Sequence, residues 1–394
     1  MNLPAQATGG AHATRAVLVA ADGEASTRVR VWGLSARERL ERGLRRAGIE
    51  QIETLERHAP GTPAGEQALV IRADFFYDER LLRALVAAPE GTALRVGSER
   101  VAARVASASV TRWPFENDPQ VRDVALEDLV PAYDPRLRKR AVPFVLPAEP
   151  GNVRAVENRI FAAAYKDTTD VVTRWIWPLP ARAVTRFCVR HGISPNTVTA
   201  ASYALTAVAT LSFALGDRAF GLGLAAAWLM TFLDTVDGKL ARTTLTSSRL
   251  GHVLDHGLDL VHPPIWWAAF AWGLAGDRPL GQQEDLVASL AIVVGGYLVG
   301  RLLEGVFMLA FGIEMFIWRP FDRLFRLVIA RRNPNLVLLT LGVATGHPRA
   351  GFHAVAAWTL GSIAIQLVRI AQALRCKRAG RPIRSFYVEA GGGG

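Results

Sequence analysis

The sequence has little cysteine, and its start contains no recognisable leader. Two cysteines occur among 394 residues, Cys188 and Cys376, and their wide separation predicts neither a disulfide framework nor a zinc site. Residues 1–15 have no apolar core behind a basic head, so we expect no secretory signal and a cytoplasmic N-terminal half. Long apolar runs are missing from residues 1–190, although half of the composition is hydrophobic. The apolar residues are therefore concentrated in the second half.

Negative charge is also scarce, and the formal net charge is +11. The basic residues gather beside apolar segments in two clusters, Arg319, Arg323, Arg326, Arg331 and Arg332, and Arg375, Lys377, Arg378, Arg381 and Arg384. Charge next to apolar segments is typical of membrane proteins, where it meets anionic lipid headgroups. We therefore predict contact with membrane lipids and no binding of nucleic acid.

Six segments are apolar enough to span or nearly span a bilayer, and the fifth is short. They are residues 197–215, 218–234, 256–275, 286–311, 335–346 and 351–374. If loop 319–332 and the C-terminal tail are cytoplasmic, residues 235–255 lie on the same side. In the loops on the opposite side, near 276–285 and 347–350, the only lysine or arginine residues are Arg278 and Arg349. We therefore expect an integral protein of an inner or plasma membrane, with its N-terminal domain and C-terminus in the cytoplasm.

The first half alternates strand and helix patterns, which predicts a small α/β domain. The patterns are apolar runs at 16–20 and 68–71 and helical periods at 35–47 and 79–87. The fold class expected for the whole chain is therefore multi-domain, a small α/β cytoplasmic domain followed by an all-α bundle of six transmembrane helices. The expected boundaries are 1–105 for the α/β domain, 106–165 for a proline-rich linker with room for one edge strand, 166–192 for a juxtamembrane amphipathic helix, 193–378 for the membrane domain and 379–394 for a cytoplasmic tail.

Four aspartates follow the second apolar segment in two pairs, Asp234 with Asp237 and Asp255 with Asp259. On helices, each spacing places the pair on one face, and a break near 243–248 would bring the pairs together. Four close carboxylates cannot all ionise without compensation, and metal binding supplies it. Oxygen ligands favour Mg²⁺ or Mn²⁺, and four carboxylates are enough for two ions. Such a pair suits phosphoryl transfer, in which a carboxylate can accept the proton of an attacking hydroxyl.

The residues between the pairs fit a nucleotide. Gly238 and Ala241 leave room on the helix face, and Arg242 can offset the charge of a diphosphate. The simpler alternative is that the aspartates only mark helix ends in water. For the whole set that alternative fails, because eight fixed positions have chance odds on the order of 10⁻⁹ per start site.

The run Asp-x2-Asp-Gly-x2-Ala-Arg-x8-Gly-x3-Asp-x3-Asp, unbroken from 234 to 259, resembles the signature of the CDP-alcohol phosphatidyltransferase family. The resemblance implies a bundle of six membrane helices. It also implies metal ligation by Asp234, Asp237 and Asp255, with Asp259 next to the metals as the general base. The residues implied to contact CDP are Gly238, Ala241, Arg242 and Gly251.

The family resemblance extends to Ser194-Pro195-Asn196-Thr197-Val198-Thr199 at the first apolar segment, which is similar to the family's Pro-Asn-x-x-Thr entry. By that resemblance Asn196 and Thr199 line the nucleotide site. A helix cap is an equally good interpretation of the same residues.

Ionisable residues inside the fourth apolar segment indicate a second part of the site. Arg301 and Glu304 lie in its cytoplasmic half, where charged groups usually face the bundle interior. With Arg331 and Arg332 they can hold an anionic acceptor, such as a polyol phosphate or a glycerolipid. The alternative is an ion pair between Arg301 and Glu304 on successive helix turns.

The N-terminal half weakly resembles a sugar-nucleotide nucleotidyltransferase, through residues 16–21, 34–49 and 70–74. The same domain order occurs in the bifunctional enzymes that make CDP-inositol and then di-myo-inositol phosphate phosphate. The loop at 21–26 departs from the pattern, however, with one glycine and no following lysine. The domain is also short. We therefore interpret it as degenerate and inactive.

The resulting hypothesis is a transferase that moves the alcohol-phosphate group of a CDP-alcohol, a CDP-diacylglycerol or a CDP-polyol, onto an acceptor hydroxyl and releases CMP. One alternative is a bifunctional enzyme whose N-terminal domain also makes the CDP-alcohol from CTP. Another is a membrane protein that binds cations without chemistry. The sequence leaves open the identity of both substrates and the existence of a homodimer.

Overall fold

The computed structural model describes residue 13 and residues 15–19, 29–55, 67–106, 121–134, 138–246 and 249–389, with the side chains of 249–260 outside that description. The chain divides into two compact units, residues 1–134, 140–164 and 243–245, and residues 135–139, 165–242 and 246–394. The first unit is α/β and the second is helical, as expected. The exact domain boundaries and the nucleotidyltransferase-like fold stay predictions.

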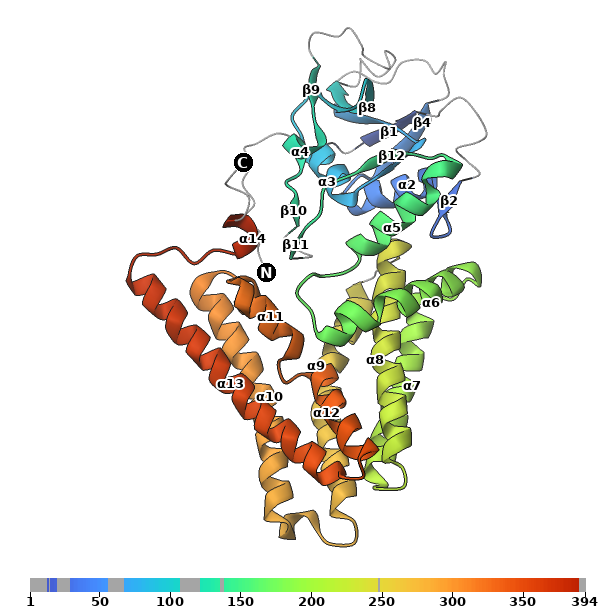
Figure 1. Cartoon of the computed structure of the whole chain (residues 1–394). Coiled ribbons are helices and arrows are strands. Elements are labelled where there is room, and N and C mark those ends of the chain that lie inside the picture. The colour runs from blue at the N-terminus through green and yellow to red at the C-terminus, as the bar shows by residue number, and fades with distance from the viewer. Residues whose placement is uncertain are drawn as a thin grey trace. The chain divides into compact units, whose positions relative to one another are not determined.

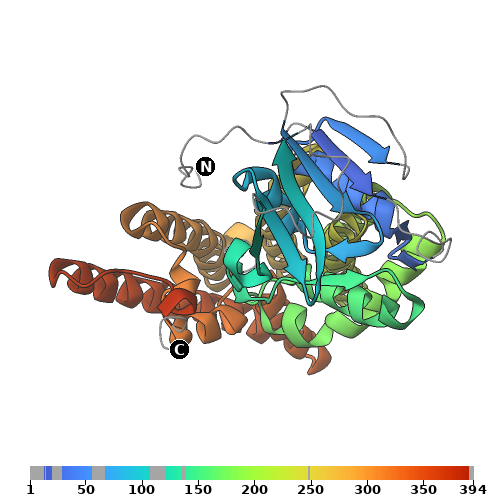
Figure 2. The ribbon, with the colours of Figure 1, turned by 90° about the horizontal axis from the view of Figure 1, so that it is seen from above.

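The first unit contains a mixed sheet of six strands in the order β4-β1-β5-β8-β7-β9 (Figure 2). The strands are β1 (Arg15–Val19), β4 (Gln51–Leu55), β5 (Gln67–Arg72), β7 (Thr92–Val96), β8 (Glu99–Ala106) and β9 (Arg122–Val124). β1 is parallel to both β4 and β5, β8 is antiparallel to β5 and β7, and β9 runs parallel to β7 at the edge. The parallel part of the sheet matches the predicted alternation of strands and helices.

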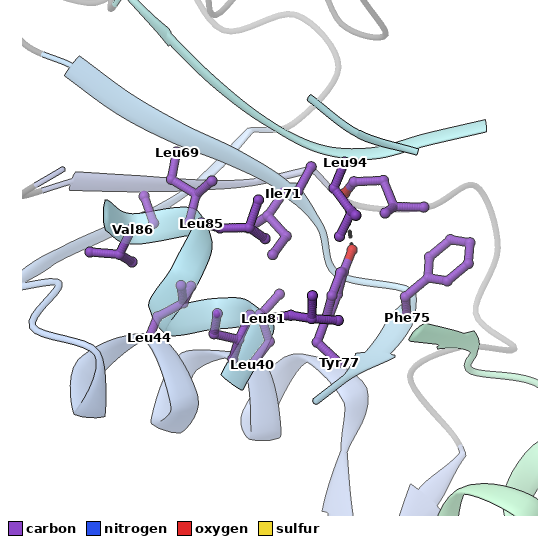
Figure 3. Close-up of a cluster of buried hydrophobic side chains, with 14 of the residues drawn as sticks. Leu40, Leu44, Leu69, Ile71, Phe75, Tyr77, Leu81, Leu85, Val86 and Leu94 are labelled. Carbon is purple, nitrogen blue, oxygen red and sulfur yellow. Dashed lines mark hydrogen bonds between the residues drawn. The ribbon is translucent and has the colours of Figure 1, made fainter. Parts of the chain in front are cut away.

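Two helices cover one face of this sheet, α2 (Ala36–Arg46) and α3 (Glu79–Ala87). Each begins at a side chain that caps free backbone N–H groups: Ser35 accepts from the Glu38 N–H, and Asp78 accepts from the Arg80 N–H at 2.9 Å. Leucine and isoleucine side chains from α2, α3 and β5 fill the space between helices and sheet (Figure 3). Within this core the Tyr77 hydroxyl donates to the Val101 carbonyl at 3.0 Å, so its polar end is satisfied.

The expected linker carries more structure than its sequence pattern indicates. Besides β9 it contains α4 (Leu126–Leu129), β10 (Tyr133–Asp134), β11 (Lys139–Arg140), β12 (Val145–Pro147), a 3₁₀ turn (Pro150–Asn152) and α5 (Val153–Ala163). β12 pairs with β6 (Phe75–Tyr77), and Phe161 of α5 stacks on Trp32, which lies between β2 (Arg30–Val31) and β3 (Leu34–Ser35). Strands of two or three residues are too short to show an alternating pattern, which explains the difference. The predicted loop at 21–26 lies outside the described residues.

Helices make up the second unit (Figure 1). They are a π-helical turn (Val172–Ile176), α6 (Pro178–Arg190), α7 (Pro195–Ala214), α8 (Phe220–Thr243), α9 (Arg249–Ala275), α10 (Glu284–Phe311), α11 (Pro320–Val328), α12 (Arg332–Ala344), α13 (Pro348–Arg378) and α14 (Phe386–Glu389), with short 3₁₀ turns at Leu280–Gln282 and Met315–Ile317. A helix lies at each of the six positions where an apolar segment was expected.

Four helices in the described part of the chain, α7, α8, α10 and α13, are long and apolar enough to cross a membrane. α12 has 13 residues. At about 1.5 Å per residue it extends roughly 20 Å, less than the hydrocarbon core of a bilayer. The count of six spanning helices therefore stays a prediction.

Close packing ties these helices together. α7 packs against α9, and α13 packs against both α10 and α12. The α12–α13 contact depends on two glycines, because a Cβ atom added to Gly342 would lie 2.7 Å from the Cα atom of Gly351. Large aromatic side chains on α7 and α9, among them Phe213 and Trp266, fill the interior of the bundle.

Residues 166–192 contain the π-helical turn and α6, which meet at Pro178. Large apolar side chains here are exposed, namely Trp175, Ile176, Leu179 and Phe187. Ala181 and Cys188 of α6 are buried. Exposed apolar side chains beside arginines suit a position at the membrane surface, and the juxtamembrane placement of this segment stays a prediction.

Candidate functional site

The first aspartate pair lies on α8, which continues past both residues to Thr243. Asp237 is 6% exposed, and its Oδ2 atom accepts a hydrogen bond of 2.6 Å from the hydroxyl of Thr199 on α7. Thr199, predicted from the sequence as a nucleotide-site residue, therefore contacts a predicted metal ligand.

The start of α7 explains how Thr199 reaches this position. The Ser194 side chain caps the helix by accepting from the Thr197 N–H at 3.1 Å. One turn later the Thr199 hydroxyl also contacts the Pro195 carbonyl at 3.1 Å. The helix cap and the contact with the aspartates thus coexist in one segment. Asn196 is exposed at this end of the helix.

Gly238 and Arg242 are packed against each other on α8. A Cβ atom added to Gly238 would lie 3.0 Å from Nη2 of Arg242, so a larger residue would displace the guanidinium. Ala241, the next small residue of the motif, is half-buried. The missing side chain at Gly238 therefore makes room for the guanidinium of Arg242, and the contacts of these residues with CDP stay a prediction.

Asp234, the other aspartate of this pair, forms an ion pair with Arg332 at the start of α12, with 2.6 Å between Oδ2 and Nη2. Arg332 was predicted to bind an anionic acceptor. The structure places its guanidinium on an aspartate predicted to hold a metal ion, and the acceptor role of Arg332 stays a prediction. A metal ion at Asp234 would have to share this carboxylate with the guanidinium of Arg332 or displace it.

The second pair, Asp255 and Asp259, belongs to α9, and Gly251 precedes it on the same helix. Their side chains lie outside the described residues. Among the side chains that the structure does describe, no group of three or more metal-binding residues gathers. Convergence of the four aspartates therefore stays a prediction.

Beside Asp234 and Arg332 lies a polar cavity of about 110 Å³ between α9, α10, α11 and α12. Its lining includes four arginines, Arg301, Arg326, Arg331 and Arg332, one carboxylate, Asp170, and the amide of Asn333. Three of these arginines were predicted to bind the acceptor, and the structure brings them around one space. The excess of positive charge favours an anion.

Two polar atoms of this cavity are buried without a hydrogen-bond partner in the described structure, Nη1 of Arg326 and Oδ1 of Asn333. The amide nitrogen of Asn333 donates to Asp170 at 2.9 Å, which leaves its oxygen for another donor. Burial, followed by the charge of Arg331, lowers the pKa of Arg326 to about 9. A ligand that accepts from Arg326 and donates to Asn333 would satisfy both atoms.

Glu304, the fourth predicted acceptor residue, lies in an adjacent small cavity that shares Arg301 and Arg331 with the first. Its carboxylate pairs closely with Arg331. The ion pair with Arg301 that we considered as an alternative is also present, at 3.9 Å. Glu304 therefore orients two arginines of the cavity wall.

Residues 192–310 match a model of the CDP-alcohol phosphatidyltransferase family. This region is a CDP-alcohol phosphatidyltransferase domain. The match covers the aspartate pairs, Gly238, Ala241, Arg242, Asn196 and Thr199. Residues 311–394, including α11 to α14, lie beyond it.

Curated relatives of the phosphatidyltransferase domain include two bacterial enzymes named phosphatidylinositol phosphate synthase. The protein of Mycobacteroides abscessus is 37% identical over 91 residues, which is 22% of this chain and 41% of the relative. That of Streptomyces avermitilis is 36% identical over 121 residues, 30% of this chain and 45% of the relative. Cholinephosphotransferase 1 of Gallus gallus is 28% identical over 132 residues, 31% of this chain and 38% of the relative. The chain thus spans less than half the length of each.

Solved structures similar to this chain include phosphatidylinositol phosphate synthase of Mycobacterium tuberculosis, in complex with manganese and citrate and, separately, with CDP-DAG bound. Both are 20% identical, with a TM-score of 0.36, and cover 48% of this chain and 87% and 92% of the solved chains.

Among the lining residues of the cavity that sequence reasoning missed are Asp170, Arg326 and Asn333. The sequence analysis named Arg326 only as part of a basic cluster. Its position three residues after Arg323, on the short amphipathic helix α11, was the signal that could have identified it as a site residue. Asp170 lies outside the phosphatidyltransferase domain, and no motif marks it.

Proposed function

We propose that this chain is an integral membrane transferase that moves the alcohol-phosphate group of a CDP-alcohol to an acceptor hydroxyl and releases CMP. One observation carries the proposal: within a CDP-alcohol phosphatidyltransferase domain, Asp237 of α8 contacts Thr199, and Asp234 of the same helix pairs with Arg332 in the wall of a cavity lined by arginines. In the proposed orientation, the aspartates, the N-terminal unit and the C-terminus are cytoplasmic.

The acceptor oxygen would form a bond to the phosphorus that carries the alcohol, while the bond from that phosphorus to the CMP oxygen breaks. Asp259 is the proposed base that takes the proton of the acceptor hydroxyl. Asp234, Asp237, Asp255 and Asp259 would hold two divalent cations, Mg²⁺ or Mn²⁺. The chemistry that such ions supply is stabilisation of negative charge on the phosphate oxygens. Arg242 would offset the charge of the CDP diphosphate, beside the proposed CDP contacts of Gly238, Ala241, Gly251, Asn196 and Thr199.

The cavity favours an acceptor that carries both a phosphate and free hydroxyl groups. Phosphate oxygens would accept from Nη1 of Arg326, and a hydroxyl would donate to Oδ1 of Asn333. These two buried atoms have no hydrogen-bond partner among the described residues, and the acceptor would supply one to each. Arg301 and Arg331 would add charge, with Glu304 holding them in place. Two relatives are named phosphatidylinositol phosphate synthase, which agrees with a polyol phosphate as acceptor.

The test is CMP release by the purified full chain in detergent. CDP-diacylglycerol and CDP-polyols would be paired with polyol phosphates and with the same polyols lacking phosphate, with Mg²⁺, Mn²⁺ or a chelator. We expect CMP only with metal and a phosphorylated acceptor, and none from Asp259→Asn. Asp285→Asn is the matched control, because Asp285 pairs with Arg349 at the other end of α10 and should leave activity unchanged.

Two results would contradict the proposal. CMP formation that survives in Asp259→Asn would remove the proposed base. Absence of CMP with every substrate pair, from folded protein that binds metal, would instead favour a membrane protein that binds cations without chemistry.

A further inference from the structure

A short segment upstream of the phosphatidyltransferase domain, residues 165–170, touches both halves of the proposed site. At its start, Nζ of Lys239 on α8 lies 3.5 Å from the centre of the Tyr165 ring. At its end, Asp170 accepts from the amide of Asn333 at 2.9 Å and lines the cavity. This segment, called the strap below, therefore connects the aspartate helix to the wall of the arginine cavity.

The middle of the strap is held by Asp167. Its carboxylate pairs with Arg174 at 3.0 Å and with Nε of Arg323 at 2.7 Å. Arg323 precedes Arg326 by three residues on α11, so both lie on one side of the helix. The Asp167–Arg323 pair thus fixes the rotation of the helix that presents Arg326 to the cavity.

The C-terminal segment supplies a third partner. The Tyr387 hydroxyl donates a short hydrogen bond to the Asp167 carboxylate and lies 3.5 Å from the Thr168 hydroxyl. Ser385 and Tyr387 are buried, at 5% and 7% exposure, although both lie beyond the last long helix. Burial and the bond to Asp167 raise the pKa of Tyr387 to about 12, so the hydroxyl keeps its proton at neutral pH and can donate.

We propose that residues 385–387 form a latch that holds Asp167 and, through Arg323, positions Arg326 for the acceptor. Tyr387 would then be a positioning residue that touches no substrate. This inference rests on the proposed function, because it assigns the cavity to the acceptor. It also explains why Ser385 and Tyr387 are buried although neighbouring residues such as Val388 are exposed.

Kinetics of Tyr387→Phe test the latch, since this change removes one oxygen atom and keeps the ring. We expect the KM for a polyol phosphate to rise about tenfold, the typical effect of losing a hydrogen bond to a charged group. The KM for the CDP-alcohol and kcat should stay within about twofold of the unchanged chain, because the aspartate helix is not displaced. Val388→Ala is the control, because the Val388 side chain is exposed.

A second variant separates the latch from a general loss of structure. Asp167→Asn should raise the same KM, and adding Tyr387→Phe to it should have little further effect, because both changes break one contact. Independent, additive effects of the two changes would overturn the proposal.

Limited trypsin digestion gives a readout without turnover. The Arg384–Ser385 bond adjoins the latch, whereas the Arg381–Pro382 bond resists trypsin because proline follows the arginine. We expect Tyr387→Phe to be cut after Arg384 about tenfold faster than the unchanged chain or Val388→Ala. Cleavage by trypsin does not depend on the activity of the protein. If the unchanged chain released no CMP, the proposed function would be wrong, but the cleavage rates would still test the latch. Equal cleavage rates, or faster cleavage with an unchanged acceptor KM, would overturn the latch.

Discussion

The arginines of the cavity differ in what they contact. Arg331 pairs with Glu304, and Arg332 pairs with Asp234, so both are compensated by carboxylates. Nη1 of Arg326, in contrast, is buried and has no hydrogen-bond partner among the described residues. A buried donor without a partner costs about 1–3 kcal/mol, which a bound anion would recover. Arg326 is therefore the residue at which acceptor binding should be most sensitive.

We predict that Arg326→Gln raises the KM for a polyol phosphate by about 10- to 100-fold, because a charged hydrogen bond to phosphate is lost. The KM for the CDP-alcohol should not change. Steady-state CMP release at varied acceptor concentration measures this. Arg349→Gln is the control, since Arg349 pairs with the exposed Asp285 away from the cavity. An unchanged KM for the polyol phosphate would show that Arg326 does not bind the phosphate.

Residue spacing and the family resemblance together predicted part of this site. Spacing on one helix predicted the pair Asp234 and Asp237, and the entry motif predicted Thr199, whose hydroxyl contacts Asp237. The contact between Arg332 and Asp234 joins residues almost a hundred positions apart, so no local pattern reveals it. Asp170, which precedes the π-helical turn, and Asn333 on α12 are far apart in the sequence, and only the fold brings them into contact.

At the scale of elements, apolar runs were informative and strands of mixed composition were not. All six apolar segments coincide with helices. A helix of 13 to 31 residues that is buried or faces lipid requires a long apolar stretch, which is easily recognised in a sequence. β4 and the β7–β8 hairpin were missed, since their strands mix charged and apolar residues, as in Gln51–Leu55. Pairing with neighbouring strands of the sheet, rather than local sequence preference, determines where such strands form.

Helix packing makes a prediction of its own, at the contact of α12 with α13. Gly342→Ala places a methyl group about where the Gly351 backbone lies, and a backbone cannot move aside as a side chain can. We expect a loss of roughly 1–3 kcal/mol of stability, seen as a lower Tm in detergent. Gly295→Ala on α10 is the control: an added Cβ there meets nothing within 4 Å, so Tm should stay the same or rise slightly. Equal Tm values for both variants would contradict the tight contact.

At the scale of the whole molecule, the question is whether the α/β unit makes the CDP-alcohol that the helical unit would consume. The resemblance of this unit to a nucleotidyltransferase would make Asp74, after β5, the metal-binding aspartate. Both oxygens of Asp74 instead accept from Arg72, at 3.0 and 2.6 Å, and Arg72 also pairs with Glu99. The bond to Asp74 raises the pKa of Arg72, so Arg72 carries its charge at neutral pH and compensates the carboxylate.

We therefore predict that the full chain releases no pyrophosphate from CTP and a polyol phosphate. The assay would use Asp259→Asn protein, in which transfer from any CDP-alcohol is blocked, with Mg²⁺ or Mn²⁺ present. Arg72→Ala should not restore pyrophosphate release, because the loop at 21–26 still has one glycine and lacks the lysine expected for a triphosphate. Pyrophosphate that forms in Asp259→Asn and disappears when Asp74→Asn is added would make the protein bifunctional. Its α/β unit would then supply the CDP-alcohol to the helical one.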